Sequence, residues 1–190
     1  MKSSIFKIGI LGDGGAGKTS LLRARKDRDF IEESKITIGV DVAVIPFELT
    51  QIDKQNPTFL AFDLGGQERF QFVHDSYLIG VKAAIIVYDL TRYPSFLSIP
   101  KWYNLIYHEN PMIPVFVVGT KKDLADEGII KKSEENFEDL RKNLPNSRNI
   151  IAHFCISAKT GEGVDELFTK CEETIQYYYS LEDTINVQVE

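Results

Sequence analysis

Cysteine and histidine are both scarce in this sequence. Its 190 residues contain two cysteines, Cys155 and Cys171, and three histidines, and none of these side chains stands at the spacing of metal ligands. Two thiols cannot form the disulfide framework of a small secreted protein, so the sequence favours a reducing compartment. Because free cysteine is among the residues most often buried, we expect both thiols to lie in the core.

An excess of positive charge is also lacking. The chain carries 22 lysines and arginines against 28 aspartates and glutamates, which gives a formal net charge of −6. Because general nucleic-acid binders are usually basic, we expect no nucleic-acid partner. No apolar stretch approaches the length that a membrane-spanning helix needs. The first apolar run, Ile5–Leu11, is interrupted by Lys7 and precedes no small-residue cleavage site, so we interpret it as a strand rather than a signal peptide.

Lipidation signals are missing from both ends of this chain. Residue 2 is lysine rather than glycine, no cysteine follows Cys171, and no basic run precedes the last residue. The motifs for N-myristoylation and for prenylation are therefore absent, so we expect no lipid anchor in this chain and a cytoplasmic location. A shortened C-terminus and a protein that never carries an anchor are both compatible with this ending.

Six short apolar runs, rich in valine, isoleucine and phenylalanine, are spread along the chain. Several of them have no polar face, which is typical of strands in a sheet that is covered on both sides. The runs are Ile5–Leu11, Val40–Leu49, Thr58–Leu64, Ala83–Leu90, Pro114–Gly119 and Ile150–Ile156. A chain of 190 residues suits one domain, and we assign residues 1–190 to it, with a core at about 5–180 and a tail at 181–190.

Helical patterns fill most of the intervals between these runs. They cover Thr19–Arg25, Pro94–Tyr107, Ser133–Lys142 and Gly163–Ser180, and a Ser-Glu-Glu start signal opens the third of them. Only a polar turn, residues 50–57, separates the second run from the third, so these two strands should form an antiparallel hairpin. The sequence therefore predicts an α/β fold: a doubly wound, six-stranded, mostly parallel sheet with one antiparallel edge strand and about five helices. Its ligand should lie beyond the carboxyl ends of the strands.

A glycine-rich motif of the form GxxxxGK[ST] follows the first predicted strand. Glycines allow the backbone to curve around phosphate oxygens, and the helix that follows directs its positive end at the same place. Lys18 would supply a full charge to the β- and γ-phosphates of a nucleotide, and the Thr19 hydroxyl would ligate Mg²⁺. The residues that we assign to nucleotide binding here are Gly12, Asp13, Gly14, Gly15, Ala16, Gly17, Lys18, Thr19 and Ser20.

A second motif ends the third run. Asp63 follows the apolar segment 59–62, at the place where phosphate-loop proteins carry the acidic residue that serves the metal. A few residues later, Gly66 can bring a backbone N–H close to a terminal phosphate, and Gln67 can orient an attacking water. Asp63 is therefore a further candidate ligand of Mg²⁺.

Two motifs at the ends of the fifth and sixth runs can select the base. A carboxylate at Asp123 can accept hydrogen bonds from the N1–H and the 2-amino group of guanine, whereas adenine lacks that pair of donors. A phosphate-loop ATPase or small-molecule kinase is the alternative, but it would leave both motifs unexplained. The residues assigned to these motifs are Thr120, Lys121 and Asp123 in the first and Ser157, Ala158 and Lys159 in the second.

In the order and spacing of these motifs, the chain resembles a small GTPase of the Ras superfamily over about residues 5–180. Among the branches of that superfamily it is most similar to the Rab branch. The segments that carry this similarity are Thr37-Ile38-Gly39-Val40-Asp41, Gly66-Gln67-Glu68-Arg69-Phe70 and Val87-Tyr88-Asp89. The resemblance implies a P-loop G domain that binds GTP and GDP with Mg²⁺.

The resemblance also assigns roles to residues that the motifs alone do not explain. Thr37 would be the threonine of switch I, giving its hydroxyl to Mg²⁺ and its N–H to the γ-phosphate, and Phe30 would pack against the guanine. Gly66 and Gln67 would belong to switch II, and Gly14 matches a position that must stay small to leave room for Gln67. Two further roles concern the base: Lys121 would lie along it and the Ala158 N–H would bind its O6.

Three positions depart from the family pattern. Thr120 stands where the family usually has asparagine, although the Rho branch also has threonine there. Leu64-Gly65 replaces the usual Thr-Ala, so that the resulting Gly-Gly pair resembles the Arf branch instead. Phe62 stands where the Rab branch typically has tryptophan, and effectors specific to that branch therefore do not follow from this sequence.

These features together predict a monomeric molecular switch that slowly hydrolyses GTP to GDP and phosphate. Gln67, Lys18 and Thr37 are the expected catalytic residues, and Thr19, Thr37 and Asp63 the expected Mg²⁺ ligands. Exchange factors, activating proteins and effectors would bind through switch I, about residues 30–42, and switch II, about residues 65–78, in signalling that resembles membrane traffic. A GTP-binding scaffold that does not hydrolyse its nucleotide is the alternative suggested by Thr120 and Leu64-Gly65.

Overall fold

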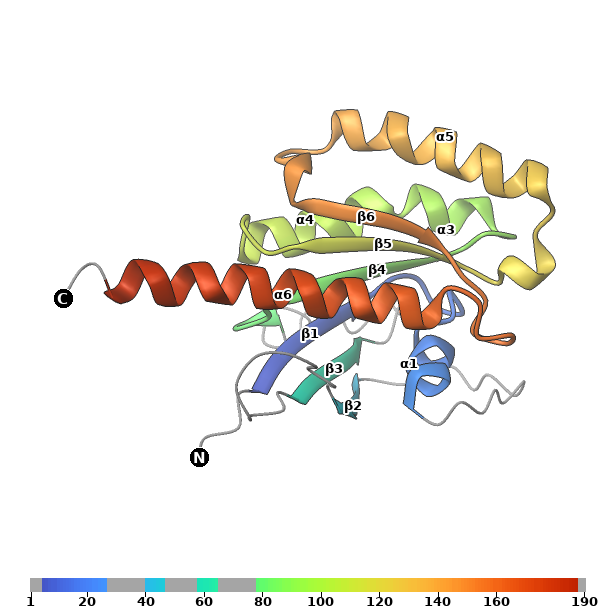
Figure 1. Cartoon of the computed structure of the whole chain (residues 1–190). Coiled ribbons are helices and arrows are strands. Elements are labelled where there is room, and N and C mark those ends of the chain that lie inside the picture. Colours follow the sequence, from blue (N-terminus) through green and yellow to red (C-terminus); the bar gives the residue numbers. More distant parts are fainter. Residues whose placement is uncertain (1–4, 27–39, 47–57, 65–77, 188–190) are drawn as a thin grey trace.

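The first strand of the chain lies in the middle of the sheet, and this position decides where the loops of the candidate site meet. In the computed structural model, which describes residues 5–26, 40–46, 58–64 and 78–187, six strands form one sheet in the order β2-β3-β1-β4-β5-β6 (Figure 1). All neighbouring pairs are parallel except β2 and β3. The strands are β1 (Ile5–Leu11), β2 (Val40–Pro46), β3 (Thr58–Leu64), β4 (Ala83–Asp89), β5 (Val115–Thr120) and β6 (Ile150–Cys155).

Helices cover both faces of this sheet, so the predicted doubly wound α/β fold is confirmed (Figure 1). Among the described residues the α-helices are α1 (Lys18–Lys26), α3 (Tyr93–Leu97), α4 (Ile99–Glu109), α5 (Glu127–Asn143) and α6 (Val164–Val187). Side chains of α1 and α6 pack on one face, and those of α3, α4 and α5 pack on the other. Strands β4 and β5 are buried along their whole length, which explains why they read as continuous apolar runs.

The antiparallel pairing of β2 with β3 confirms the predicted hairpin strands. The predicted end of the second run, residues 47–49, and the turn at 50–57 lie outside the described residues. Residues 65–77, which make up most of the interval between β3 and β4, also lie outside the described residues. Among the described residues, no helix is long and apolar enough to cross a membrane.

Two helix predictions were wrong in their boundaries. The single helix predicted over Pro94–Tyr107 is interrupted at Ser98, and α4 begins at the next residue with Pro100 in its first turn. Proline has no N–H to donate and clashes with the preceding turn inside a helix, so the chain starts a new helix where proline is tolerated. The helix predicted over Gly163–Ser180 ends later than expected, because α6 continues to Val187.

The start of α5 lies six residues before the predicted start at Ser133. Asp126 is the residue that caps this helix, since its carboxylate accepts a hydrogen bond from the Ile129 N–H at 2.8 Å. Ser133 is instead a buried residue inside the helix. The expectation for the cysteines is confirmed for Cys171, which is buried, whereas Cys155 is only half-buried.

The carboxyl ends of the parallel strands lie at one edge of the sheet, as the register of their pairs requires. The segments that follow β1, β4, β5 and β6 therefore meet at this edge. These four segments are residues 12–17, 90–92, 121–126 and 156–163. Three of them contain predicted nucleotide-binding residues, so the fold brings the phosphate motif and the two base motifs together.

Candidate functional site

Three of the four glycines in the phosphate loop have backbone conformations that other residues could adopt only with strain. Gly12 has φ of +142°, and a Cβ placed on it would lie 2.1 Å from the carbonyl oxygen of Val87 on β4. Gly15 and Gly17 also have positive φ values, of +73° and +95°. Gly14 is different, because a Cβ there would meet no described atom within 4 Å. The loop therefore depends on glycine for its backbone conformation at three of its four glycines.

Lys18 lies at the start of α1, directly below this loop. Its side chain is buried, with 5% of its surface exposed. The Nζ group donates to the carbonyl oxygens of Gly12 at 2.8 Å and Asp13 at 2.9 Å. These bonds hold the ammonium group across the mouth of the loop, where it can reach phosphate oxygens. Thr19 and Ser20 follow in the first turn of α1 and are half-buried.

Three side chains from the segment after β4 hold the phosphate loop from outside. Arg92 donates to the Gly14 carbonyl oxygen at 2.7 Å. The two oxygens of the Asp13 carboxylate accept hydrogen bonds from the Ser98 hydroxyl at 2.8 Å and the Trp102 indole N–H at 2.9 Å. These contacts could not be predicted from the sequence, because they join residues about 80 to 90 positions apart and sequence patterns are local.

Thr120 connects the phosphate loop to the base side of the site. Its hydroxyl lies 2.6 Å from the Ala16 carbonyl oxygen and 3.0 Å from that of Tyr88, and only 1% of the residue is exposed. One hydroxyl has one proton to donate, so the shorter contact to Ala16 is the principal bond. The hydroxyl thus links β5 to the loop after β1 at the position where the family usually has asparagine.

Asp123 and Ser157 bring the two base motifs together. The Ser157 hydroxyl, which is fully buried, donates to an Asp123 carboxylate oxygen at 2.6 Å. Two backbone bonds support this contact, one from the Ile156 N–H to Gly119 and one from the Lys122 N–H to Ile156. The bond leaves the second oxygen of the exposed Asp123 side chain without a hydrogen bond to the described residues. A carboxylate held in this way can accept donors from a base.

Lys121 has a left-handed backbone, with φ of +61°, which turns the chain sharply after β5. Its Nζ group forms an ion pair with Asp89 at 2.6 Å. Burial alone would raise the pKa of Asp89, but the hydrogen bonds from Lys121 and Thr91 outweigh burial and lower this pKa below its ordinary value. Asp89 is therefore an anion that fixes Lys121, and it was not among the predicted site residues.

The remaining predicted residues are described only in part. Ala158 is buried and Lys159 is exposed, both directly after Ser157. Of Asp63 only the backbone is described, and it pairs with Ile10, two residues before the phosphate loop. Hydroxyl and carboxylate oxygens are the ligands that Mg²⁺ prefers, so the chemistry of Thr19 and Asp63 suits that ion. Phe30, Thr37, Gly66 and Gln67 lie outside the described residues.

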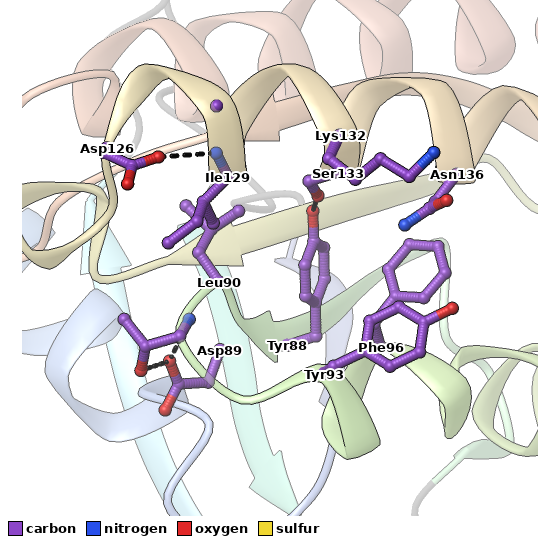
Figure 2. Close-up of a pocket in the computed structure, with 12 residues that line it drawn as sticks. Tyr88, Asp89, Leu90, Tyr93, Phe96, Asp126, Ile129, Lys132, Ser133 and Asn136 are labelled. Carbon is purple, nitrogen blue, oxygen red and sulfur yellow. Dashed lines mark hydrogen bonds between the residues drawn. The ribbon is translucent and has the colours of Figure 1, made fainter.

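A pocket of about 470 Å³ lies next to this site, between α3 and α5 (Figure 2). Its walls are mostly apolar, and Figure 2 shows Tyr88 in its middle, with Asp89 and Asp126 toward one end and Lys132 and Asn136 toward the other. None of the predicted nucleotide-binding residues lines it. Asp89 connects the two, since it lines the pocket and also pairs with Lys121 of the candidate site.

A cluster of polar side chains in the wall of this pocket joins β4, β6 and α5. The Tyr88 hydroxyl lies 2.5 Å from the Ser133 hydroxyl and 2.7 Å from Nε2 of His153. His153 also stacks on Phe137, with ring centroids 4.4 Å apart. Burial lowers the pKa of His153 to about 4 and raises the pKa of Tyr88 above its ordinary value. His153 is thus neutral near pH 7.

Comparisons with known proteins identify the family of this chain. A sequence model of the Ras family matches residues 7–177. Ras-related protein Rab-19 of Mus musculus is 34% identical over 165 residues, which are 86% of this chain and 72% of that protein. The Ypt/Rab-type GTPase YPT7 of Saccharomyces cerevisiae is 34% identical over 172 residues, 88% of this chain and 79% of that protein. The probable Ras-related protein Rab-4A of Echinococcus multilocularis is 32% identical over 169 residues, 88% of this chain and 71% of that protein.

Proposed function

The chain belongs to the Ras family and is a Rab-like small GTPase, and we propose that it binds GTP and GDP with Mg²⁺ and slowly hydrolyses GTP as a switch in membrane traffic. The observation that carries this proposal is the bond from the Thr120 hydroxyl to Ala16. It joins the loop that can bind phosphates to the strand that leads to Asp123. A phosphate site and a base-selecting carboxylate are thus parts of one hydrogen-bonded unit.

In this proposal the base is selected by Asp123 and held from two sides. Its carboxylate, positioned by Ser157, accepts the N1–H and the 2-amino group of guanine. Lys121, fixed by Asp89, lies along the base, and the Ala158 N–H donates to the guanine O6. Adenine has an amino group in place of O6 and no N1–H, so it would leave a donor and an acceptor of the site unpaired.

The proposed Mg²⁺ ligands are Thr19, Thr37 and Asp63. Bound by these residues, Mg²⁺ would supply positive charge beside the phosphates of the nucleotide. On the protein side, Lys18 and the backbone N–H groups of residues 13–18 would stabilise the charge that develops on the phosphates. The positive φ values of three loop glycines support this role, because a backbone that curves around phosphate oxygens needs such conformations.

Hydrolysis requires a water positioned opposite the leaving phosphate, and we assign this role to Gln67 with Thr37 beside it. Phosphoryl transfer of this kind depends on positioning and electrostatic stabilisation rather than on covalent chemistry. An arginine supplied by an activating protein raises the rate of GTP hydrolysis by a factor of about 10³–10⁵ in such systems. We therefore expect slow turnover by the chain alone.

The switch itself would consist of residues 30–42 and 65–78. The N–H groups of Thr37 and Gly66 can bond a γ-phosphate, which GDP lacks, so the two segments would be held by GTP and released after hydrolysis. Regulatory proteins and effectors would distinguish the two states there. We further propose that residues 1–190 act as a single G domain and that the protein is a monomer.

Single-turnover hydrolysis of radiolabelled GTP tests the enzymatic part of this proposal. The wild-type protein should release phosphate far more slowly than about 1 s⁻¹, and Gln67→Leu should slow the release further without weakening GTP binding. Glu138→Gln, an exposed change on α5, is the matched control. Release near or above 1 s⁻¹ without a partner, or equal rates for the wild type and Gln67→Leu, would contradict the proposal.

A further inference from the structure

We propose that Arg92 is a positioning residue of the phosphate loop, and that together with Ser98 and Trp102 it slows the dissociation of bound nucleotide by fixing the loop at Gly14 and Asp13. The inference rests on the proposed function in so far as a nucleotide occupies the loop. Its structural part, the fixing of the loop, concerns contacts that the protein itself contains.

Arg92 contacts the phosphate loop at Gly14 and Gly15. One terminal nitrogen of the guanidinium donates to the Gly14 carbonyl oxygen at 2.7 Å. Both terminal nitrogens also lie within 4 Å of the position that a Cβ of Gly15 would take. Because a phosphate loop directs its N–H groups inward, its carbonyl groups need partners on the outside. Arg92 supplies such a partner for the carbonyl group of Gly14.

The second anchor is the Asp13 side chain. A carboxylate inside a loop that binds phosphates would repel them if it pointed at the ligand. Ser98 and Trp102 each donate to one of its oxygens, at 2.8 and 2.9 Å, and so hold the carboxylate against α4. The loop is therefore tied at two successive residues, Asp13 and Gly14, to the segment that follows β4.

The arginine is itself held by a compact turn after β4. The Arg92 N–H bonds to the Asp89 carbonyl oxygen at 3.0 Å. Its own carbonyl oxygen accepts bonds from the N–H and the hydroxyl of Ser95, at 2.9 and 2.7 Å. The same turn contains the carboxylate of Asp89, which pairs with Lys121 of the base side. The backbone at Arg92 is thus already ordered, so only the side chain loses conformational entropy when it contacts the loop.

These contacts lead to a defined effect on nucleotide release. A loop held in its binding conformation loses less conformational entropy on binding, and the loop must deform before phosphates can leave. One exposed hydrogen bond corresponds to roughly a two- to ten-fold change in an equilibrium constant. We therefore expect GDP to dissociate about five-fold faster when the Arg92 contact is removed.

The experiment measures the dissociation rate of fluorescent GDP in Mg²⁺ from the wild-type protein and five variants. Arg92→Met keeps most of the side-chain stem but has no donor, and it should release GDP about five-fold faster. Arg92→Lys keeps a charged donor and should stay within about two-fold of the wild type. Ser98→Ala and Trp102→Phe remove the donors to Asp13 and should each raise the rate by about two- to five-fold.

Arg141→Met is the matched control. Arg141 also donates to a backbone carbonyl, that of Ile150 at 3.2 Å, but it lies at the other end of the sheet from the phosphate loop. Its removal should leave the GDP dissociation rate unchanged. Equal rates for Arg92→Met and the wild type, or equal increases for Arg92→Met and Arg141→Met, would overturn the proposal, and so would a failure of lysine to restore the rate.

Hydrogen exchange separates this proposal from the proposed function. On the purified proteins, exchange in a peptide covering residues 12–19 should be faster in Arg92→Met than in Arg92→Lys, Arg141→Met and the wild type. If the wild type binds no guanine nucleotide, the proposed function fails, and this exchange result still decides whether Arg92 fixes the loop. Unchanged exchange in Arg92→Met would overturn the positioning role whether or not GDP binds.

Discussion

The loop at residues 12–17 owes its path mainly to glycines with positive φ, whereas the loops at residues 119–123 and 156–159 are joined to each other by a side-chain hydrogen bond. In the phosphate loop, Gly12 fits between β1 and β4 only because it has no Cβ. On the base side, the Thr120 hydroxyl donates to the Ala16 carbonyl oxygen and the Ser157 hydroxyl donates to the Asp123 carboxylate. All three loops lie at the carboxyl ends of parallel strands, at the same edge of one sheet.

This difference explains which positions can change. A backbone conformation that requires glycine has no substitute, so the phosphate motif keeps its full pattern in this chain. A hydrogen bond between side chains needs only a donor at a suitable distance, and threonine supplies one at residue 120 where the family usually has asparagine. We therefore expect substitutions on the phosphate side to be more damaging than those on the base side.

The largest effect should follow from Gly12→Ala. The new Cβ would lie 2.1 Å from the Val87 carbonyl oxygen and would impose a strained φ of +142° on alanine. Backbone displacement between two central strands should lower the free energy of unfolding by roughly 3 kcal/mol or more, as judged by urea denaturation. Gly14→Ala is the control, since its Cβ would have open space, and its unfolding midpoint should stay close to that of the wild type.

Asp123→Ala should have the second largest effect. This effect should appear mainly in the binding of guanine nucleotides. Losing two hydrogen bonds to a charged carboxylate should weaken GDP binding by about 100-fold or more in a fluorescence titration. Asp126→Ala, three residues further along, removes the cap of α5 and should cost about 1 kcal/mol of stability while leaving GDP affinity unchanged. Equal GDP affinities for Asp123→Ala and Asp126→Ala would contradict the role of Asp123.

Acidification should lower the stability of the folded protein through His153. Its pKa of about 4 in the folded protein lies below the unfolded value of 6.5, so the unfolded state binds more protons as the pH falls through this interval. Stability that is present above pH 6.5 should therefore decrease by about 2 kcal/mol between pH 7 and pH 5. Urea denaturation at the two pH values should show a smaller decrease for His153→Phe, and equal decreases would argue against this source.

The smallest of these effects should follow from Thr120→Val. Valine keeps the shape of threonine but leaves the buried Ala16 carbonyl oxygen without its donor, which should cost about 1–2 kcal/mol of stability. GDP should also dissociate faster, because the link between the two sides of the site is lost. Thr120→Ser keeps the hydroxyl and should lie closer to the wild type in both measurements. If valine and serine behave alike, the hydroxyl is not the link between the two sides.

The sequence predicted the parts of the molecule that depend on local pattern. Buried strands gave continuous apolar runs, and the phosphate motif predicted the loop from Gly12 to Thr19 together with its place between β1 and α1. The base motifs were predicted because their residues follow strands β5 and β6. In each case the informative residues lie within a few positions of one another.

The remaining features depend on contacts between distant segments. No local pattern in the sequence predicts that Ser98 and Trp102 donate to the carboxylate of Asp13. Arg92 belongs to no motif, so its contact with the phosphate loop could not be predicted either. The start of α5 was misplaced because a Ser-Glu-Glu signal at Ser133 competes with the true cap at Asp126, and only the packing of Ser133 below Tyr88 decides between them. Local capping patterns do not contain that information.

The most direct test of the whole account is the binding of fluorescent GDP and ADP to the purified protein, first with Mg²⁺ and then with EDTA. The account predicts tight GDP binding that weakens when EDTA removes the metal, and no binding of ADP at the same concentrations. Such a result would support the joint action of the phosphate loop, Mg²⁺ and Asp123 with threonine at residue 120. Equal or preferred binding of ADP would contradict the assignment of Asp123 and leave only the phosphate loop as a nucleotide-binding element.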